Sequence, residues 1–195
     1  MNKYHILIIL NILILCVILL QYFGIIRYIK LHLNSTEYYI EKFKNLKSYK
    51  DNKLSVFVKT DKDNLPKLKP LINSLLDQTI KINELNLIVK IKNESDYNNL
   101  DIPKYISLTS NIIPSYNSED NLNTLFTHEK SKNTIVFNLD DKKVYGKDYI
   151  EHLLSEYNCD DDYMVRCDND MIIQNSDNID NVKKVNYNEN YGLIF

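Results

Sequence analysis

The sequence predicts an α/β fold: a mostly parallel sheet flanked by helices, preceded by one transmembrane helix. Three observations predict it. The chain is almost continuously apolar from Ile6 to Ile26, strand-like and helix-like segments alternate from Leu54 onward, and an acidic pair, Asp140 and Asp141, ends one strand-like segment. Such alternation is typical of parallel sheets. The expected organisation is an anchor with its flanks, a juxtamembrane stem and one globular domain, at 1–30, 31–53 and 54–195.

The composition and net charge of the chain say little about which class of molecule the protein binds. The 195 residues carry a net charge of -2, so no basic field argues for a nucleic-acid partner. The chain is rich in Asn, Lys, Ile and Tyr and lacks Ala and Trp, as expected of an AT-rich coding genome. Local features must therefore identify the partner.

The amino-terminal apolar run is interrupted only by Asn11, Gln21 and Gly24. About 20 apolar residues suffice to cross the hydrocarbon core as a helix. A cleaved signal peptide has a shorter apolar core, about 7–15 residues, followed by small residues. We therefore favour an uncleaved, single-pass membrane anchor, with a signal peptide as the alternative.

The side of the membrane and the organelle stay open. Lys3 precedes the apolar run, whereas several basic residues follow it, which favours a cytoplasmic domain. The glycosylation sequons at 34–36 and 93–95 would instead suit a lumenal domain.

The charged segment from Leu31 to Lys50 predicts a juxtamembrane helix or stem. Five of its residues recur at helical spacing: Tyr39, Ile40, Phe43, Leu46 and Lys47. The alternative is a helix continuous with the anchor and without chemistry of its own.

The first part of the domain reads as strand, helix, strand. Leu54 to Val58 suits a buried strand, and a helix follows in which Asp63 or Asn64 is the expected cap and Pro66 lies in the first turn. Its apolar face is formed by Leu68, Leu71, Ile72, Leu75 and Leu76. The run from Leu85 to Ile91 is the expected second strand.

The middle of the domain is less strongly patterned. Residues 105–108 suggest a short third strand, 111–117 a loop containing Pro114, and 119–130 a helix, before the strand that begins at Thr134.

The carboxyl-terminal part continues with a helix marked by Ile150, Leu153, Leu154 and Tyr157, and a strand at 163–165. Acidic loops at 159–162 and 168–170 lack the glycine and terminal glutamate of a calcium loop. Residues 169–190 are weakly patterned, and 191–195 suggest a last strand. Cys159 and Cys167 are not expected to form a zinc site, because no His lies nearby.

The acidic pair is a candidate site because of its place. Ligands of open α/β sheets bind outside the carboxyl ends of the strands, where Asp140 and Asp141 are expected. Two hard oxygen donors there suit Mg²⁺ or Mn²⁺ against a diphosphate. The alternative is that the pair only opens a turn.

Three segments together resemble the nucleotide-sugar glycosyltransferases with the GT-A fold, specifically the family 2-like group. LSVFVKTDKDNLPKLKPLINSLLDQTI looks like the opening strand, loop and helix of that family, with its Ser-Leu-Leu-x-Gln-Thr-like end at 74–79. TIVFNLDDKKVYGKDYIEHLL looks like the strand, aspartate motif and following helix, and YGLIF is similar to a later glycine-bearing strand. The resemblance covers 54–195 in order and implies a Rossmann-like GT-A domain.

The resemblance also implies the ligands and their residues. It implies a nucleoside diphosphate sugar and a divalent ion, Mn²⁺ or Mg²⁺, that stabilises the leaving diphosphate as a Lewis acid. The implied metal ligands are Asp140 and Asp141, and the implied nucleotide-sugar site comprises Thr60, Asp61, Asp140, Asp141 and Lys142.

The chain departs from the family pattern in several places. Lys142 replaces the third motif carboxylate, so metal affinity is expected to drop; the lysine would contact the diphosphate instead. Residues 90–92 lack the acidic residue offered to the nucleoside, and 118–123 lack a Gly-Pro. The chain stops at Phe195, so the acceptor side and its catalytic carboxylate have no counterpart and no base is identified.

Three functions are compatible with the sequence. The first is a membrane-anchored transferase that moves a sugar to a glycan, protein or lipid. The second is a catalytically inactive relative that serves as a binding or assembly module on a membrane. The third is an unrelated α/β domain in which Asp140 and Asp141 are only a turn.

Overall fold

The computed structural model describes residues 3–22, 24–50, 52–116, 134–156, 164–167, 170–173 and 182–184. The predicted helix at 119–130, the predicted strand at 191–195, and Cys159 and Tyr157 lie outside these residues.

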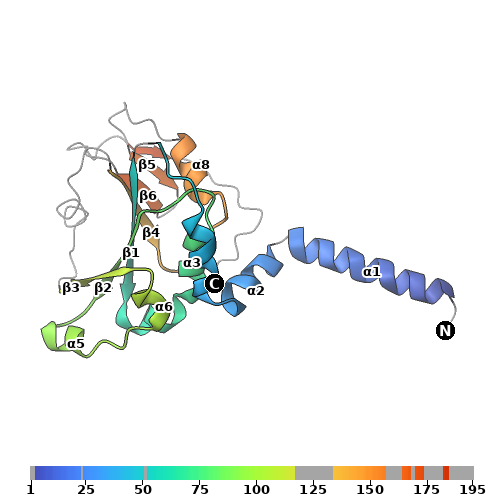
Figure 1. The fold of residues 1–195 in the computed structure, drawn as a ribbon, viewed down its shortest axis with the longest axis horizontal. Coiled ribbons are helices and arrows are strands. Elements are labelled where there is room, and N and C mark those ends of the chain that lie inside the picture. The colour runs from blue at the N-terminus through green and yellow to red at the C-terminus, as the bar shows by residue number, and fades with distance from the viewer. Residues whose placement is uncertain are drawn as a thin grey trace.

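The apolar amino terminus forms two helices rather than one. Helix α1 (Lys3–Tyr22) extends away from the rest of the protein (Figure 1), and its apolar side chains are exposed. It is long and apolar enough to cross a membrane, which confirms that part of the prediction. Gly24 has φ 67°, a left-handed conformation that glycine adopts without steric cost, and helix α2 (Ile25–Leu33) begins directly after it. Helix α1 therefore ends before Gly24, and the last two isoleucines of the apolar run, Ile25 and Ile26, belong to α2.

The segment predicted as a stem is folded against the domain. Helix α3 (Thr36–Lys44) is capped by Ser35, whose hydroxyl accepts from the Tyr38 backbone N–H. Both α2 and α3 pack against α4 (Lys69–Leu76), and Leu31 and Tyr39 belong to the main hydrophobic core. Residues 31–53 thus contribute core side chains of their own.

The described residues form a sheet of seven strands in the order β3-β2-β1-β4-β6-β5-β7. Their bounds are β1 Lys53–Asp61, β2 Glu84–Lys90, β3 Asn111–Ser115, β4 Thr134–Asp140, β5 Met164–Cys167, β6 Asp170–Ile173 and β7 Val182–Lys184. The first four in this order pair in parallel, and β6 alone runs against its neighbours β4 and β5. The predicted α/β fold with a mostly parallel sheet is confirmed.

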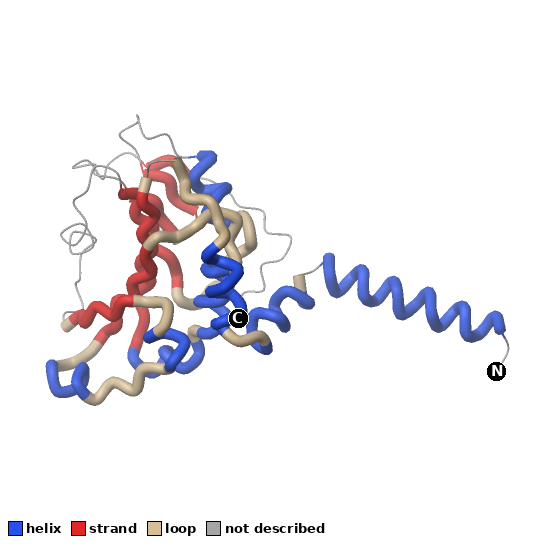
Figure 2. Tube along the Cα trace, in the orientation of Figure 1, coloured by secondary structure: helices blue, strands red, loops and turns tan. Residues whose placement is uncertain are grey.

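The two faces of the sheet are packed unequally. Val56 and Val58 of β1 belong to the main core, and Figures 1 and 2 show α2, α3 and α8 (Tyr149–Glu156) on the same side of the sheet. Phe57, which points to the opposite face because successive strand residues alternate, forms a small second cluster with Ile88 and Val136.

Two predictions in the middle of the domain are wrong. Residues predicted as the third strand form helix α6 (Lys104–Ser107), which starts after Pro103, and the predicted loop at 111–117 contains β3. Pro114 is tolerated because β3 is the edge strand and needs no donor on its outer side. A short helix, α5 (Glu94–Asn98), precedes α6.

Other boundaries also differ. Asp63, Asn64 and Pro66 lie in a 3₁₀ helix, η1 (Lys62–Lys67), so none of them caps α4. The apolar face predicted for this helix is correct, since its leucines are buried. Residues 169–190, predicted as weakly patterned, contain β6 and β7.

Candidate functional site

The strand order places the predicted residues at one edge of the sheet. From β1, the chain adds β2 and β3 on one side and β4 on the other, so the order reverses between β1 and β4. Such a reversal leaves a crevice at the carboxyl ends of the two strands, where α/β proteins bind ligands. Lys59 of β1 pairs with Asp140 of β4, which brings Thr60 and Asp141 together just beyond this pair.

Asp141 is held by two neutral donors. Its Oδ2 accepts from Thr60 Oγ1 at 2.7 Å and from Asn64 Nδ2 at 3.3 Å. Thr60 is buried, with 4% of its surface exposed, whereas Asp141 is half-buried. The carboxylate is therefore fixed in position while its negative charge is not neutralised by either contact. Asn64 was expected only as a helix cap, and nothing in the sequence links it to a residue 77 positions away.

Asp140 serves the turn instead. Its Oδ1 accepts from the Lys142 backbone N–H at 3.0 Å, the local contact by which aspartate stabilises turns. Its own backbone N–H donates to the Tyr145 hydroxyl at 2.8 Å, and that hydroxyl donates to the Asp140 carbonyl at 2.9 Å. The turn interpretation therefore describes Asp140, whereas Asp141 faces the crevice.

A cleft of ≈ 460 Å³, which we call the strand-end cleft, lies beside this turn. Asp141 is the carboxylate that lines it, and Lys67, Lys142 and Lys143 supply positive charge. Of the other predicted residues, Asp61 is exposed and, like Thr60 and Asp140, does not line the cleft. The cleft therefore combines one fixed carboxylate with three lysines.

Helix α2 forms one wall of the cleft through Tyr28 and His32. Burial raises the pKa of the Tyr28 phenol above its ordinary value of 10.0. The phenol of this wall residue therefore stays protonated at neutral pH.

The loop that follows Asp141 is anchored by the segment from Ser74 to Thr79. Ser74 Oγ accepts from the Tyr145 N–H at 3.1 Å. Gln78 Nε2 donates to the Gly146 carbonyl at 2.6 Å, and its Oε1 accepts from the Ile150 N–H at 3.1 Å. Ser74 and Gln78 are almost fully buried, with 0% and 1% exposed.

This anchoring role was missed at the level of sequence. The resemblance covers this segment only as a family-like ending of a helix and assigns its polar residues no function. The available signal was a serine and a glutamine on an otherwise apolar helical face, since buried polar side chains are almost always hydrogen-bonded.

The described residues hold no group of three or more His, Cys, Asp or Glu side chains that could together bind a metal ion. Asp141 is the one carboxylate among the residues that line the cleft, so a divalent ion bound to it would take most of its other ligands from a diphosphate and water, as Mg²⁺ often does.

The scan against protein-family models matches no family, and no curated protein matches the chain. Function must therefore be argued from the site.

Proposed function

We propose that the chain is a membrane-anchored glycosyltransferase-like protein that binds a nucleoside diphosphate sugar in the cleft beside the turn that follows β4. The observation that supports this most is Asp141, which Thr60 and Asn64 hold at the topological switch point of the sheet. Fixing a carboxylate without neutralising it lowers its reorganisation cost when a ligand binds. The GT-A resemblance of the segments around β1 and β4 gives the ligand class.

The charge of the cleft agrees with a diphosphate ligand. Lys142 lines the cleft at the position where the resemblance implies a third carboxylate. We propose that its ammonium group contacts the diphosphate and takes over part of the role of a metal ion. Asp141 would either bind a divalent ion, Mn²⁺ or Mg²⁺, or accept a hydrogen bond from a hydroxyl group of the ligand.

A second candidate, an inactive binding or assembly module on a membrane, is favoured by the same lysine. A charged lysine cannot coordinate a metal, so the cleft is weaker as a Lewis-acid site than a cleft with three carboxylates. Incubation with a panel of nucleotide sugars distinguishes the two: reproducible hydrolysis or transfer supports the transferase, and binding without turnover supports the module.

The proposal is tested by thermal unfolding of the full chain in a nonionic detergent, with nucleoside diphosphates and with or without Mn²⁺. A ligand at about 100 times its dissociation constant stabilises the folded state by about 2.7 kcal/mol. We expect this shift in the wild type and in Asp101→Asn, an exposed carboxylate away from the cleft, but a much smaller one in Asp141→Asn. No shift with any nucleoside diphosphate would contradict both candidates.

The role of Lys142 has its own test. If the cleft descends from a metal site, Lys142→Asp restores the carboxylate and should make nucleotide binding depend strongly on Mn²⁺. Unchanged metal dependence would show that this position does not contact the ligand.

A further inference from the structure

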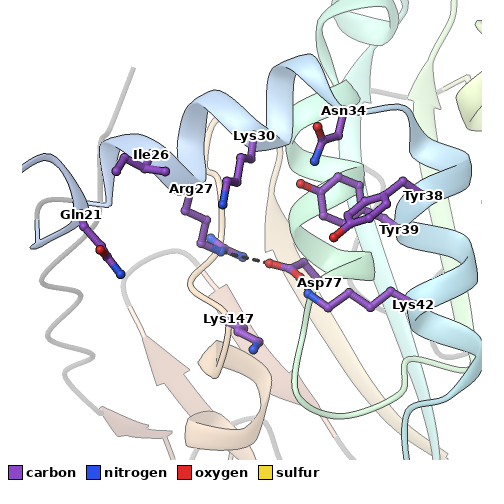
Figure 3. A pocket seen from close by; sticks show the side chains of 10 residues that line it. All are labelled: Gln21, Ile26, Arg27, Lys30, Asn34, Tyr38, Tyr39, Lys42, Asp77 and Lys147. Carbon is purple, nitrogen blue, oxygen red and sulfur yellow. Dashed lines mark hydrogen bonds and ion pairs between the residues drawn. The ribbon is translucent and has the colours of Figure 1, made fainter. Parts of the chain in front are cut away.

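A second pocket, of ≈ 600 Å³, lies where the end of α1 meets the domain. Other side chains of α2 line it, together with α3 and with the loop that carries Lys147 (Figure 3). We call it the juxtamembrane pocket. It shares no lining residue with the strand-end cleft, and none of its residues was predicted as part of a site.

The juxtamembrane pocket is strongly cationic. Four cationic side chains line it, Arg27, Lys30, Lys42 and Lys147, against a single carboxylate, Asp77. Arg27 Nε lies 3.2 Å from Asp77 Oδ2, and Lys42 Nζ contacts Asp77 Oδ1. The carboxylate is therefore already neutralised by two cations.

Positive charge remains after this pairing. Lys30 and Lys147 are exposed, and within the described part of the chain no ion pair to either is formed. Arg27 Nη1 donates to the Tyr145 carbonyl at 2.8 Å, while its Nη2 is buried without a hydrogen-bond partner among the described residues. Unsatisfied buried donors are costly, so this atom favours an acceptor in the pocket.

The position of the pocket at the end of α1 indicates which kind of molecule could supply this hydrogen-bond acceptor. Gln21, in the last turn of α1, lines it. A helix of 20 residues is about 30 Å long, which matches the hydrocarbon core of a bilayer. If α1 spans the bilayer, the pocket opens at the level of the lipid headgroups. Tyr38 and Tyr39 in the pocket add the amphipathic rings that are enriched at this level.

We propose that the juxtamembrane pocket binds the phosphate of an anionic membrane phospholipid. Lys30, Lys147 and the free Nη2 of Arg27 supply the charge and the donors, and juxtamembrane basic clusters attract anionic lipids. The proposal rests on the anchoring of α1 in the membrane but not on nucleotide binding in the strand-end cleft.

The test uses the full chain in a nonionic detergent, titrated with dioctanoyl phosphatidic acid and, separately, with dioctanoyl phosphatidylcholine. We expect phosphatidic acid to bind at least about tenfold more tightly. Lys30→Gln with Lys147→Gln should remove this preference. The matched pair Lys47→Gln with Lys92→Gln changes the same charge at two exposed positions outside the pocket and should keep it. Lys30→Arg with Lys147→Arg should also keep it, which excludes misfolding as the cause.

Three outcomes would overturn the proposal. The first is equal affinity for the two lipids, and the second is an equal loss in both glutamine pairs. The third is complete displacement of phosphatidic acid by inorganic phosphate at the same affinity, which would make the pocket a site for a soluble anion. Flotation of the chain with neutral phosphatidylcholine vesicles tests the anchor separately, since insertion of α1 requires no anionic lipid.

Discussion

The strand-end cleft and the juxtamembrane pocket each contain one carboxylate, but the two carboxylates have different neighbours. Asp141 accepts hydrogen bonds from a hydroxyl and an amide, whereas Asp77 is paired with a guanidinium and an ammonium group. Neither contact neutralises the charge of Asp141, whereas Asp77 forms ion pairs that hold α2 and α3 against the domain. The partners of a carboxylate, rather than its presence, therefore indicate whether it is suited to binding a ligand or to stabilising the fold.

The two regions also meet in one loop. Val144 lines the strand-end cleft and Lys147 lines the juxtamembrane pocket. Arg27 joins them, since it pairs with Asp77 and donates to the Tyr145 carbonyl. Substitutions can therefore be chosen to affect both regions, one region or neither.

The largest effect on stability is expected from Gln78→Ala, because Gln78 anchors the loop that both pockets share. The change leaves the buried N–H of Ile150 and the carbonyl of Gly146 without their partner. We expect the free energy of unfolding to fall by about 3 kcal/mol. Chemical denaturation of the full chain in nonionic detergent, followed by circular dichroism, measures it. Asn99→Ala, which removes an exposed amide bonded to the Ser95 carbonyl, should cost less than about 0.5 kcal/mol. A similar cost for both variants would show that Gln78 does not anchor the loop.

The next effect separates the two carboxylates. Asp77→Asn leaves Arg27 and Lys42 without their anion, and breaking a fully buried pair costs about 3–5 kcal/mol. Here the cations are 28% and 43% exposed, so we expect only about 2 kcal/mol. The melting temperature should fall by about 4 °C or more. If Asp141→Asn lowers it equally, the two carboxylates do not differ in role.

Asp141→Asn should change stability little and binding strongly. The asparagine oxygen can still accept from Thr60, so the free energy of unfolding should change by less than about 0.5 kcal/mol. Loss of the charge should weaken nucleoside diphosphate binding in the presence of Mn²⁺ at least about tenfold. Thermal unfolding without ligand and a ligand titration measure the two quantities. A variant that is unstable yet binds normally would reverse the roles proposed for the two pockets.

The smallest effect on the melting temperature is expected from Glu37→Gln, which removes an exposed carboxylate outside both pockets. The pKa of Glu37 is held below its ordinary value of 4.5 by a backbone hydrogen bond at the start of α3 and by Lys104. The pKa of Glu37 is lower in the folded state than in the unfolded state, so the ionised carboxylate stabilises the folded protein. This stabilisation is fully present at a pH above the unfolded pKa and is lost as the pH falls through the folded pKa. Glu37→Gln should therefore lower the melting temperature slightly at neutral pH, and the difference from the wild type should vanish in acid. A difference that persists in acid strong enough to protonate the carboxyl in both the folded and the unfolded state would assign it to packing.

The sequence was informative where apolar residues form long or strictly periodic patterns. β1, β2, β4 and the leucine face of α4 follow from such patterns. The short elements α6 and β3 do not, because Pro114 in isolation indicates a loop, and only its place on an edge strand makes a strand possible. The sequence around Leu31 and Tyr39 shows a helical stripe but does not reveal the surface against which it packs.

The candidate site was only partly predictable for a similar reason. The apolar run that predicts β4 places Asp140 and Asp141 at its carboxyl end, and the structure confirms this position. Asp140 and Asp141 are adjacent in the turn, and the apolar pattern of the sequence does not indicate which of the two faces the cleft. The contacts of Asp77 with Arg27 and Lys42 join residues 50 and 35 positions apart, so they depend on how α2 and α3 dock.

Amide hydrogen exchange of the full chain tests most directly whether the strand-end cleft binds a nucleoside diphosphate, because it locates the binding site. With a saturating nucleoside diphosphate and Mn²⁺, slower exchange is expected in peptides that contain Thr60 to Asn64 and Asp140 to Val144. Exchange in α3 should not change, because α3 lines the other pocket. Protection confined to α3, or none at all under conditions that saturate binding, would contradict binding in this cleft.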